Sequence, residues 1–147
     1  MLTMLLLLLA QPRPAAGEGP IIVKVVITIA GAGTFKAEGE GRCSHSTKPP
    51  ITFDWGVSYT NRDRKAAFQT LLLSTKDTDS GSTELISLLL GAGEKMWALS
   101  TIPGLTQSGR GKASVKRAGP GAHIDVDGVT VDGERVQASI DCSRVTD

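Results

Sequence analysis

The chain has 147 residues, with 16 Lys and Arg against 15 Asp and Glu, so its formal net charge is +1. The length suits a single domain, and the small net charge argues against a nucleic-acid-binding protein, which usually carries a strong basic excess. A hydrophobic content of 40% argues against intrinsic disorder.

The first recognisable element is an apolar run at residues 4–10, which is followed by Pro12 and Pro14. The run is too short to cross a bilayer, which takes roughly 20 apolar residues, and it has the length of the apolar part of a signal peptide. Residues 1–16 are therefore interpreted as a signal peptide-like segment, and residues 17–147 as the single mature domain. The alternative is a buried first strand or helix, which both prolines disfavour.

Alternation of apolar and polar side chains predicts short β-strands along the rest of the chain. Residues 21–29 are almost all β-branched and are expected to form a strand that is buried on both faces. Further strands are predicted at residues 34–43, 51–60, 68–75, 85–90, 96–102, 112–117, 124–126 and 136–142. Turn residues such as Asp132-Gly133 separate them. This pattern predicts an all-β fold, a two-sheet antiparallel β-sandwich (Ig-like or barrel-like) of about eight strands.

The two cysteines, Cys43 and Cys142, each lie on the apolar side of a predicted strand. Two inward-facing thiols in an exported chain, without a third cysteine to compete, are expected to form a disulfide. Phe53 and Trp55 are expected to pack near this disulfide because they share a face with other apolar residues. Trp97 is the aromatic residue considered for an exposed binding position.

Only two histidines are available for catalysis, His45 and His123. Ser44 and Ser46 flank His45, but a catalytic triad is defined by geometry and not by proximity in sequence. The segment around His45 also precedes residues 47–50, which contain a Pro-Pro dipeptide and are interpreted as an exposed loop. A small secreted hydrolase that uses His45 or His123 is therefore kept as the alternative to a non-enzymatic protein.

Three aspartates form the second polar candidate: Asp125 and Asp127 alternate along one strand, and Asp132 lies in the turn that follows. Clusters of carboxylates can bind calcium, and this pattern is compatible with a calcium-dependent adhesion module. A solvent-exposed strand face has the same pattern, and no complete calcium-binding loop is present. We therefore expect no metal site and no cofactor.

A recurrent pattern of glycines and short strands marks the C-terminal part: residues 109–115, Gly119, Ile124, Val126, Gly128 and residues 136–142. Together with Cys43, this pattern resembles the mycobacterial lipoprotein antigens of the 19-kilodalton type. The resemblance implies an exported, β-rich domain in which a cysteine near the C-terminus pairs with an upstream cysteine. No cysteine follows the apolar run closely, so the resemblance does not imply a lipid anchor here.

These observations predict an exported protein of the cell envelope or the extracellular space with a non-catalytic binding or structural role. We expect no catalytic residues, no nucleic-acid partner and no transmembrane segment. The ligand, an envelope or extracellular molecule, and the oligomeric state are not indicated by the sequence.

Overall fold

The computed structural model describes residues 19–46, 53–76, 82–102 and 109–147. These residues form an all-β domain in which all pairings between neighbouring strands are antiparallel. The signal peptide-like segment predicted at residues 1–16 lies outside the described residues. The strands are β1 (Ile21–Ile29), β2 (Gly33–His45), β3 (Trp55–Thr60), β4 (Thr70–Thr75), β5 (Ser82–Thr83), β6 (Ile86–Ala92), β7 (Lys95–Ser100), β8 (Gly109–Ala118), β9 (Gly121–Thr130) and β10 (Arg135–Cys142). No helix in the described part of the chain is long and apolar enough to cross a membrane.

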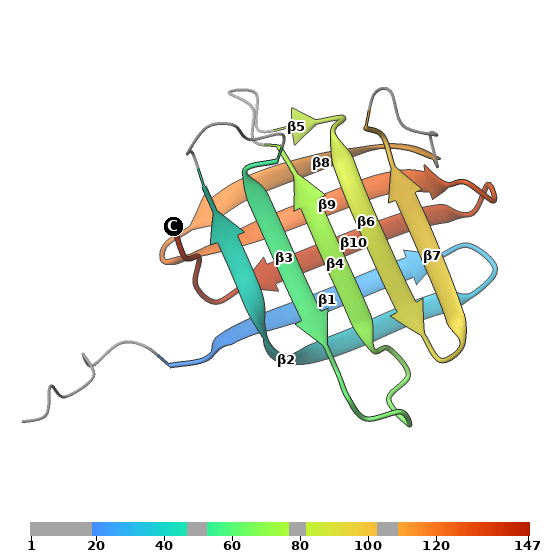
Figure 1. The fold of residues 1–147 in the computed structure, drawn as a ribbon, viewed down its shortest axis with the longest axis horizontal. Helices are drawn as coiled ribbons and strands as arrows, with labels where there is room; N and C mark the ends of the chain where they lie inside the picture. Colours follow the sequence, from blue (N-terminus) through green and yellow to red (C-terminus); the bar gives the residue numbers. More distant parts are fainter. Residues whose placement is uncertain (1–18, 47–52, 77–81, 103–108) are drawn as a thin grey trace, which may run out of the picture.

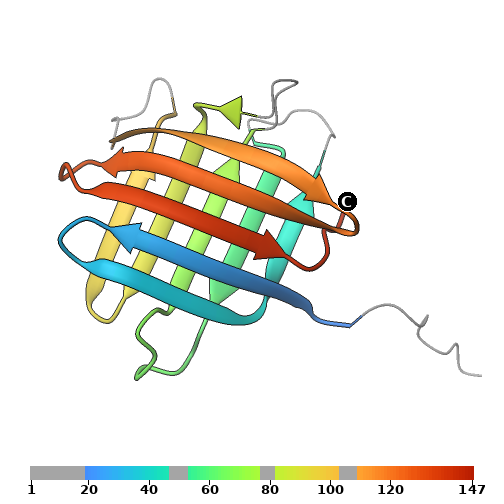
Figure 2. The same ribbon diagram turned by 180° about the vertical axis from the view of Figure 1, so that it is seen from behind.

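All the strands belong to one continuous sheet, in the order β5-β8-β9-β10-β1-β2-β3-β4-β6-β7. The sheet coils into a nearly closed, barrel-like shape, in which β3, β4, β6 and β7 form one layer and β8, β9, β10 and β1 form the other (Figure 1). The two separate sheets expected from the sequence are not confirmed, because β2 connects the two layers without a break in the hydrogen-bonded ladder (Figure 2).

The connection depends on a bend in β2. The first part of this strand pairs with β1, and its last part pairs with β3; Gly41 pairs with both Ile21 and Tyr59. A Cβ atom at Gly41 would lie 2.5 Å from the carbonyl oxygen of Ser58 and 2.7 Å from Cγ2 of Val23. The two layers can therefore meet at this position only because the residue has no side chain.

The interior between the layers is filled with apolar side chains. Ile27, Leu71, Ile86 and Ile140 are all completely buried, and residues from both layers join them in one hydrophobic core. The predicted alternation is confirmed in most strands, since inward and outward residues follow each other one by one. The strand β1 differs from the expectation: only its odd-numbered residues point inward, and Val26 on its outer side is 43% exposed.

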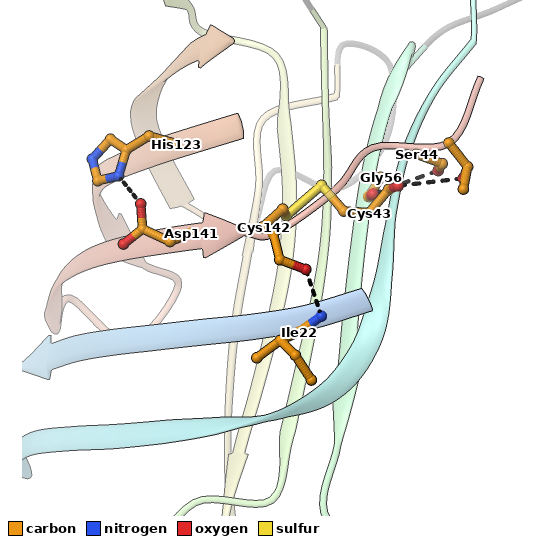
Figure 3. Close-up of a disulfide and its surroundings, with 9 residues drawn as sticks. Ile22, Cys43, Ser44, Gly56, His123, Asp141 and Cys142 are labelled. Atoms are coloured by element: carbon orange, nitrogen blue, oxygen red, sulfur yellow. Dashed lines mark hydrogen bonds and ion pairs between the residues drawn. A yellow bond between two sulfur atoms is a disulfide. The ribbon is translucent and has the colours of Figure 1, made fainter. Parts of the chain in front are cut away.

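The predicted disulfide between Cys43 and Cys142 is present, with a Cα–Cα distance of 6.2 Å (Figure 3). Cys43 lies in the part of β2 that pairs with β3, and Cys142 ends β10, so the disulfide links the two layers. Both cysteines are buried. Trp55 lies on the same inward side as Val57, which is the residue opposite Cys43. Trp55 thus occupies the predicted region, whereas Phe53 precedes β3 and is only partly buried.

Candidate functional site

A cluster of polar side chains lies on the outer surface of β9 and β10, centred on His123. The Nδ1 atom of His123 is 2.6 Å from Oδ1 of Asp141, the residue directly opposite on β10. The Nε2 atom is 3.1 Å from Oδ2 of Asp125, two positions along the same strand. The cluster therefore arises from the two nearest neighbours that a sheet provides, the cross-strand partner and the residue at i+2.

The two carboxylates determine the protonation of the imidazole. The hydrogen bond to Asp141 is the largest influence and raises the pKa of His123 above its ordinary value of 6.5; partial burial opposes this, and the negative charge of Asp125 adds to it. In the protonated ring both nitrogens donate, one to each carboxylate. The two carboxylates thus stabilise the imidazolium form of His123 relative to an imidazole without these partners.

Ser139 completes a Ser-His-Asp arrangement, because its Oγ lies 3.5 Å from Nε2 of His123. This contact is longer than the 3.1 Å between the same nitrogen and Asp125. Ser139 also lies on β10 between β9 and β1, where the backbone N–H groups form the hydrogen bonds between neighbouring strands of the sheet. The geometry resembles a triad in its residue types, but Asp125 competes for the nitrogen that would accept the proton of the serine.

A shallow groove of about 480 Å³ adjoins the cluster on the outer surface of β8, β9, β10 and β1. Most of its exposed lining is apolar, and the polar side chains that line it are those of Thr28, Lys112, Ser114, Asp125, Asp127, Gln137 and Ser139. Asp127 accepts a hydrogen bond of 2.9 Å from the guanidinium of Arg135. Hydroxyl, amide and carboxylate groups at this spacing can hydrogen-bond a polar ligand that lies flat across the strands.

Two of the three aspartates proposed as calcium ligands contact other side chains in the structure. Asp125 is bonded to His123 and Asp127 to Arg135. Asp132 lies in the turn between β9 and β10. Among the described residues, no group of three or more His, Cys, Asp or Glu side chains is arranged to hold a metal ion.

The other histidine lies at the end of a strand, and the exposed loop predicted at residues 47–50 lies outside the described residues. His45 ends β2, and its ring lies against Trp55 with 4.6 Å between the ring centroids. Arg117 covers the same indole at 4.9 Å and forms an ion pair of 3.2 Å with Asp147. The Nε1 atom of Trp55 is buried and has no hydrogen-bond partner within the described part of the chain. The strand continues beyond the expected end because His45 packs on this aromatic ring.

Trp97, considered as an exposed aromatic, is also buried, with 6% of its surface exposed. It lies on the inward side of β7, where its ring is 5.9 Å from that of Phe35. This side of β7 is buried because it faces the core between the two layers. The sequence of β7 alone does not show this burial.

A larger cavity of about 730 Å³ lies where the sheet fails to close, between the start of β8 and the residues that flank β6 and β7. Leu99 of β7 packs here against Gly109 and Gly128. Three glycines line this cavity together with Thr101, Arg110 and Asp127, and Glu84 forms an ion pair of 3.9 Å with Lys112. The groove beside His123 differs from this cavity in its contact with the hydrogen-bonded cluster of His123, Asp125 and Ser139.

Asp141 and Ser139 were not among the residues singled out from the sequence. A hairpin centred on Asp132 places residue 123 opposite residue 141, so the register of the predicted turn contained this signal.

Comparison of the chain with models of protein families, with curated proteins and with solved structures finds no significant match in any of the three.

Proposed function

We propose that the protein is exported to the cell envelope or the extracellular space, where it has a non-catalytic binding or structural role. The observation that carries this proposal is the buried disulfide between Cys43 and Cys142. Disulfides persist in oxidising compartments and are rare where thiols are kept reduced. The apolar run at residues 4–10 adds independent support, since its length fits a signal peptide.

The binding role is assigned to the groove beside His123. It lies on the outside of a filled core and offers hydroxyl, amide and carboxylate groups from four neighbouring strands. The competition for the Nε2 atom of His123 supports a non-catalytic role, because Asp125 lies 3.1 Å from this atom and Ser139 lies 3.5 Å from it. A polar, hydrogen-bonding envelope component is the ligand class that this surface fits.

Export and oxidation are tested together by intact-mass analysis of the protein made in an exporting bacterial host. We expect the loss of about the first 16 residues and of two further hydrogens. A Cys43→Ala, Cys142→Ala double variant is the matched control, which should be processed without the loss of hydrogens. A full-length chain with two free thiols would contradict the proposal.

Binding is tested by capture of envelope components on the immobilised mature protein. Asp127→Asn changes the groove, whereas Glu38→Gln makes the same chemical change on β2, outside the groove lining. We expect Asp127→Asn to reduce the capture of a specific component and Glu38→Gln to leave it unchanged. Equal capture by both variants would contradict the proposal that the ligand binds in the groove.

A small hydrolase is the second candidate function, and the alignment of Ser139, His123 and Asp141 is the observation that favours it. In this case Ser139→Ala and His123→Asn would each abolish the hydrolysis of activated esters. Asp125→Asn would increase hydrolysis, because it frees the Nε2 atom of His123 to accept a proton. Hydrolysis that is unaffected by Ser139→Ala would dismiss this candidate.

A further inference from the structure

The outer surface of one layer carries no charged side chain. The outward-facing residues of β3, β4, β6 and β7 are Gly56, Ser58, Thr60, Thr70, Leu72, Ser74, Ser87, Leu89, Gly91, Met96, Ala98 and Ser100. We refer to this set as the uncharged face. Figure 1 shows these four strands side by side as one layer.

Two large apolar side chains are exposed on the uncharged face. Leu72 is 44% exposed and Met96 57% exposed. Met96 lies across Gly91, where its sulfur would be 2.9 Å from an added Cβ atom. Charged side chains border the uncharged face: Arg42 of β2 lies opposite Ser58, Lys95 begins β7, Glu94 lies in the β6–β7 turn, and the β3–β4 connection contains Arg62, Asp63, Arg64 and Lys65. An apolar centre with a charged rim is the usual composition of a protein–protein interface.

We propose that the uncharged face binds the same face of a second copy of this chain. In a two-fold symmetric contact, the residues near the axis meet their own copies. A charged side chain at such a position would face a like charge, which is strongly unfavourable. The uncharged face meets this condition over its full width, whereas the opposite layer presents charges on every strand.

The composition of the uncharged face favours a second copy over a lipid surface. Six of its residues carry hydroxyl groups: Ser58, Thr60, Thr70, Ser74, Ser87 and Ser100. Hydrocarbon would leave these hydroxyls without hydrogen-bond partners, and anionic headgroups attract basic side chains, which this face lacks. A second copy offers matching hydroxyls and two further apolar side chains.

The area of the uncharged face limits the expected affinity between the two copies. Four strands at about 4.8 Å spacing and about 20 Å length cover roughly 400 Å² in projection. A stable interface of standard size buries about 800 Å² on each partner, so this contact belongs to the weak class. We expect a dissociation constant of about 10 µM to 1 mM.

Sedimentation velocity of the oxidised protein between about 5 µM and 1 mM tests the proposal. The wild type should shift from monomer to dimer, and Leu72→Lys should raise the dissociation constant at least tenfold. Val26→Lys is the matched control, because Val26 is 43% exposed on the opposite layer; it should leave the constant unchanged. Circular dichroism verifies that both variants fold.

Three results would overturn the proposal. The first is a wild type that stays monomeric at the highest concentration. The second is a dimer that Leu72→Lys leaves intact or that Val26→Lys disrupts equally. The third is flotation of the wild type, but not of Leu72→Lys, with phosphatidylcholine vesicles, which would assign the uncharged face to lipid.

Discussion

The two layers of the domain share one core but have very different outer surfaces. One layer, formed by β8, β9, β10 and β1, is the charged layer. Its acidic and basic side chains form pairs between neighbouring strands, as in the Lys24–Glu38 pair at 3.6 Å and the Asp127–Arg135 pair at 2.9 Å. The uncharged face has only small, hydroxyl-bearing or apolar residues. Alternation is equally regular in both layers, so the fold determines which residues point outward. The difference in their chemistry is therefore not imposed by the fold, and both proposed contacts, the groove ligand and the second copy, depend on it.

The disulfide between the layers gives the largest expected effect. Replacing both Cys43 and Cys142 with Ala removes a link that joins residues 99 positions apart. In the chain-entropy model, a loop of this length stabilises the folded state by about 4–5 kcal/mol. Urea denaturation of the variant should show a loss of this size, shared by both layers in one transition. A loss below about 1 kcal/mol would mean that the layers hold together without the covalent link.

The bend in β2 gives the next largest effect. Gly41→Ala places a Cβ atom against the backbone of Ser58 and should cost about 2–3 kcal/mol in unfolding free energy. Gly39→Ala is the matched control on the same side of the strand, because its Cβ atom would meet only the ring of Tyr59, at 3.2 Å. Thermal denaturation should separate the two variants clearly. Equal losses would indicate that Gly41 has no special role where the layers meet.

The His123 cluster makes the stability of the charged layer dependent on pH. Asp141 raises the pKa of His123 in the folded state. The stabilisation is therefore fully present below the unfolded value of about 6.5, and it is lost as the pH rises through the higher folded value. Because the ring is 34% exposed, we expect a contribution of about 1 kcal/mol or less.

An NMR titration of the His123 ring protons measures this effect. Asp141→Asn should lower the pKa of His123 and reduce the excess stability at pH 5 relative to pH 9. Asp125→Asn should lower the pKa less, because Asp141 has the largest influence. An unchanged titration in Asp141→Asn would contradict the assignment.

The exposed ion pairs should have the smallest effect. Lys24 and Glu38 are 61% and 59% exposed, and such pairs contribute about 0.2–1 kcal/mol. A double-mutant cycle with Lys24→Gln and Glu38→Gln should give a coupling energy at the lower end, which salt reduces further. A coupling energy above about 2 kcal/mol would mean that the ion pairs stabilise the layer that carries them. The charges of that layer would then be explained by the stability of the fold.

Much of the fold could be predicted because strand alternation is a local property. The inward phase of Cys43 and Cys142 sufficed to predict the disulfide, and the Asp132-Gly133 turn marked the hairpin that contains His123. Which strands become neighbours is a non-local property. The double pairing of β2 therefore did not follow from its sequence, and two separate sheets were expected instead of one.

The errors at single residues have the same origin. The β-branched residues of β1 suggested burial on both faces, but Val26 points away from the single core. His45 and Trp97 were judged from their immediate neighbours in sequence, whereas their positions depend on Trp55 and Phe35 from other strands. The contact between His123 and Asp141 is a different case, because the register of the predicted hairpin already placed these two residues opposite each other.

The position of β1 has a consequence for how the chain folds. This strand pairs with β2, which follows at once, and with β10, so that Val23 lies opposite Cys142. One edge of β1 can therefore form its hydrogen bonds only after β10 has been synthesised. Such long-range pairing slows folding, and this edge is available to other chains in the meantime. Pairing of β10 with β1 thus comes late in the assembly of the domain, and the disulfide between Cys43 and Cys142, which forms with an external two-electron oxidant, then fixes this pairing covalently.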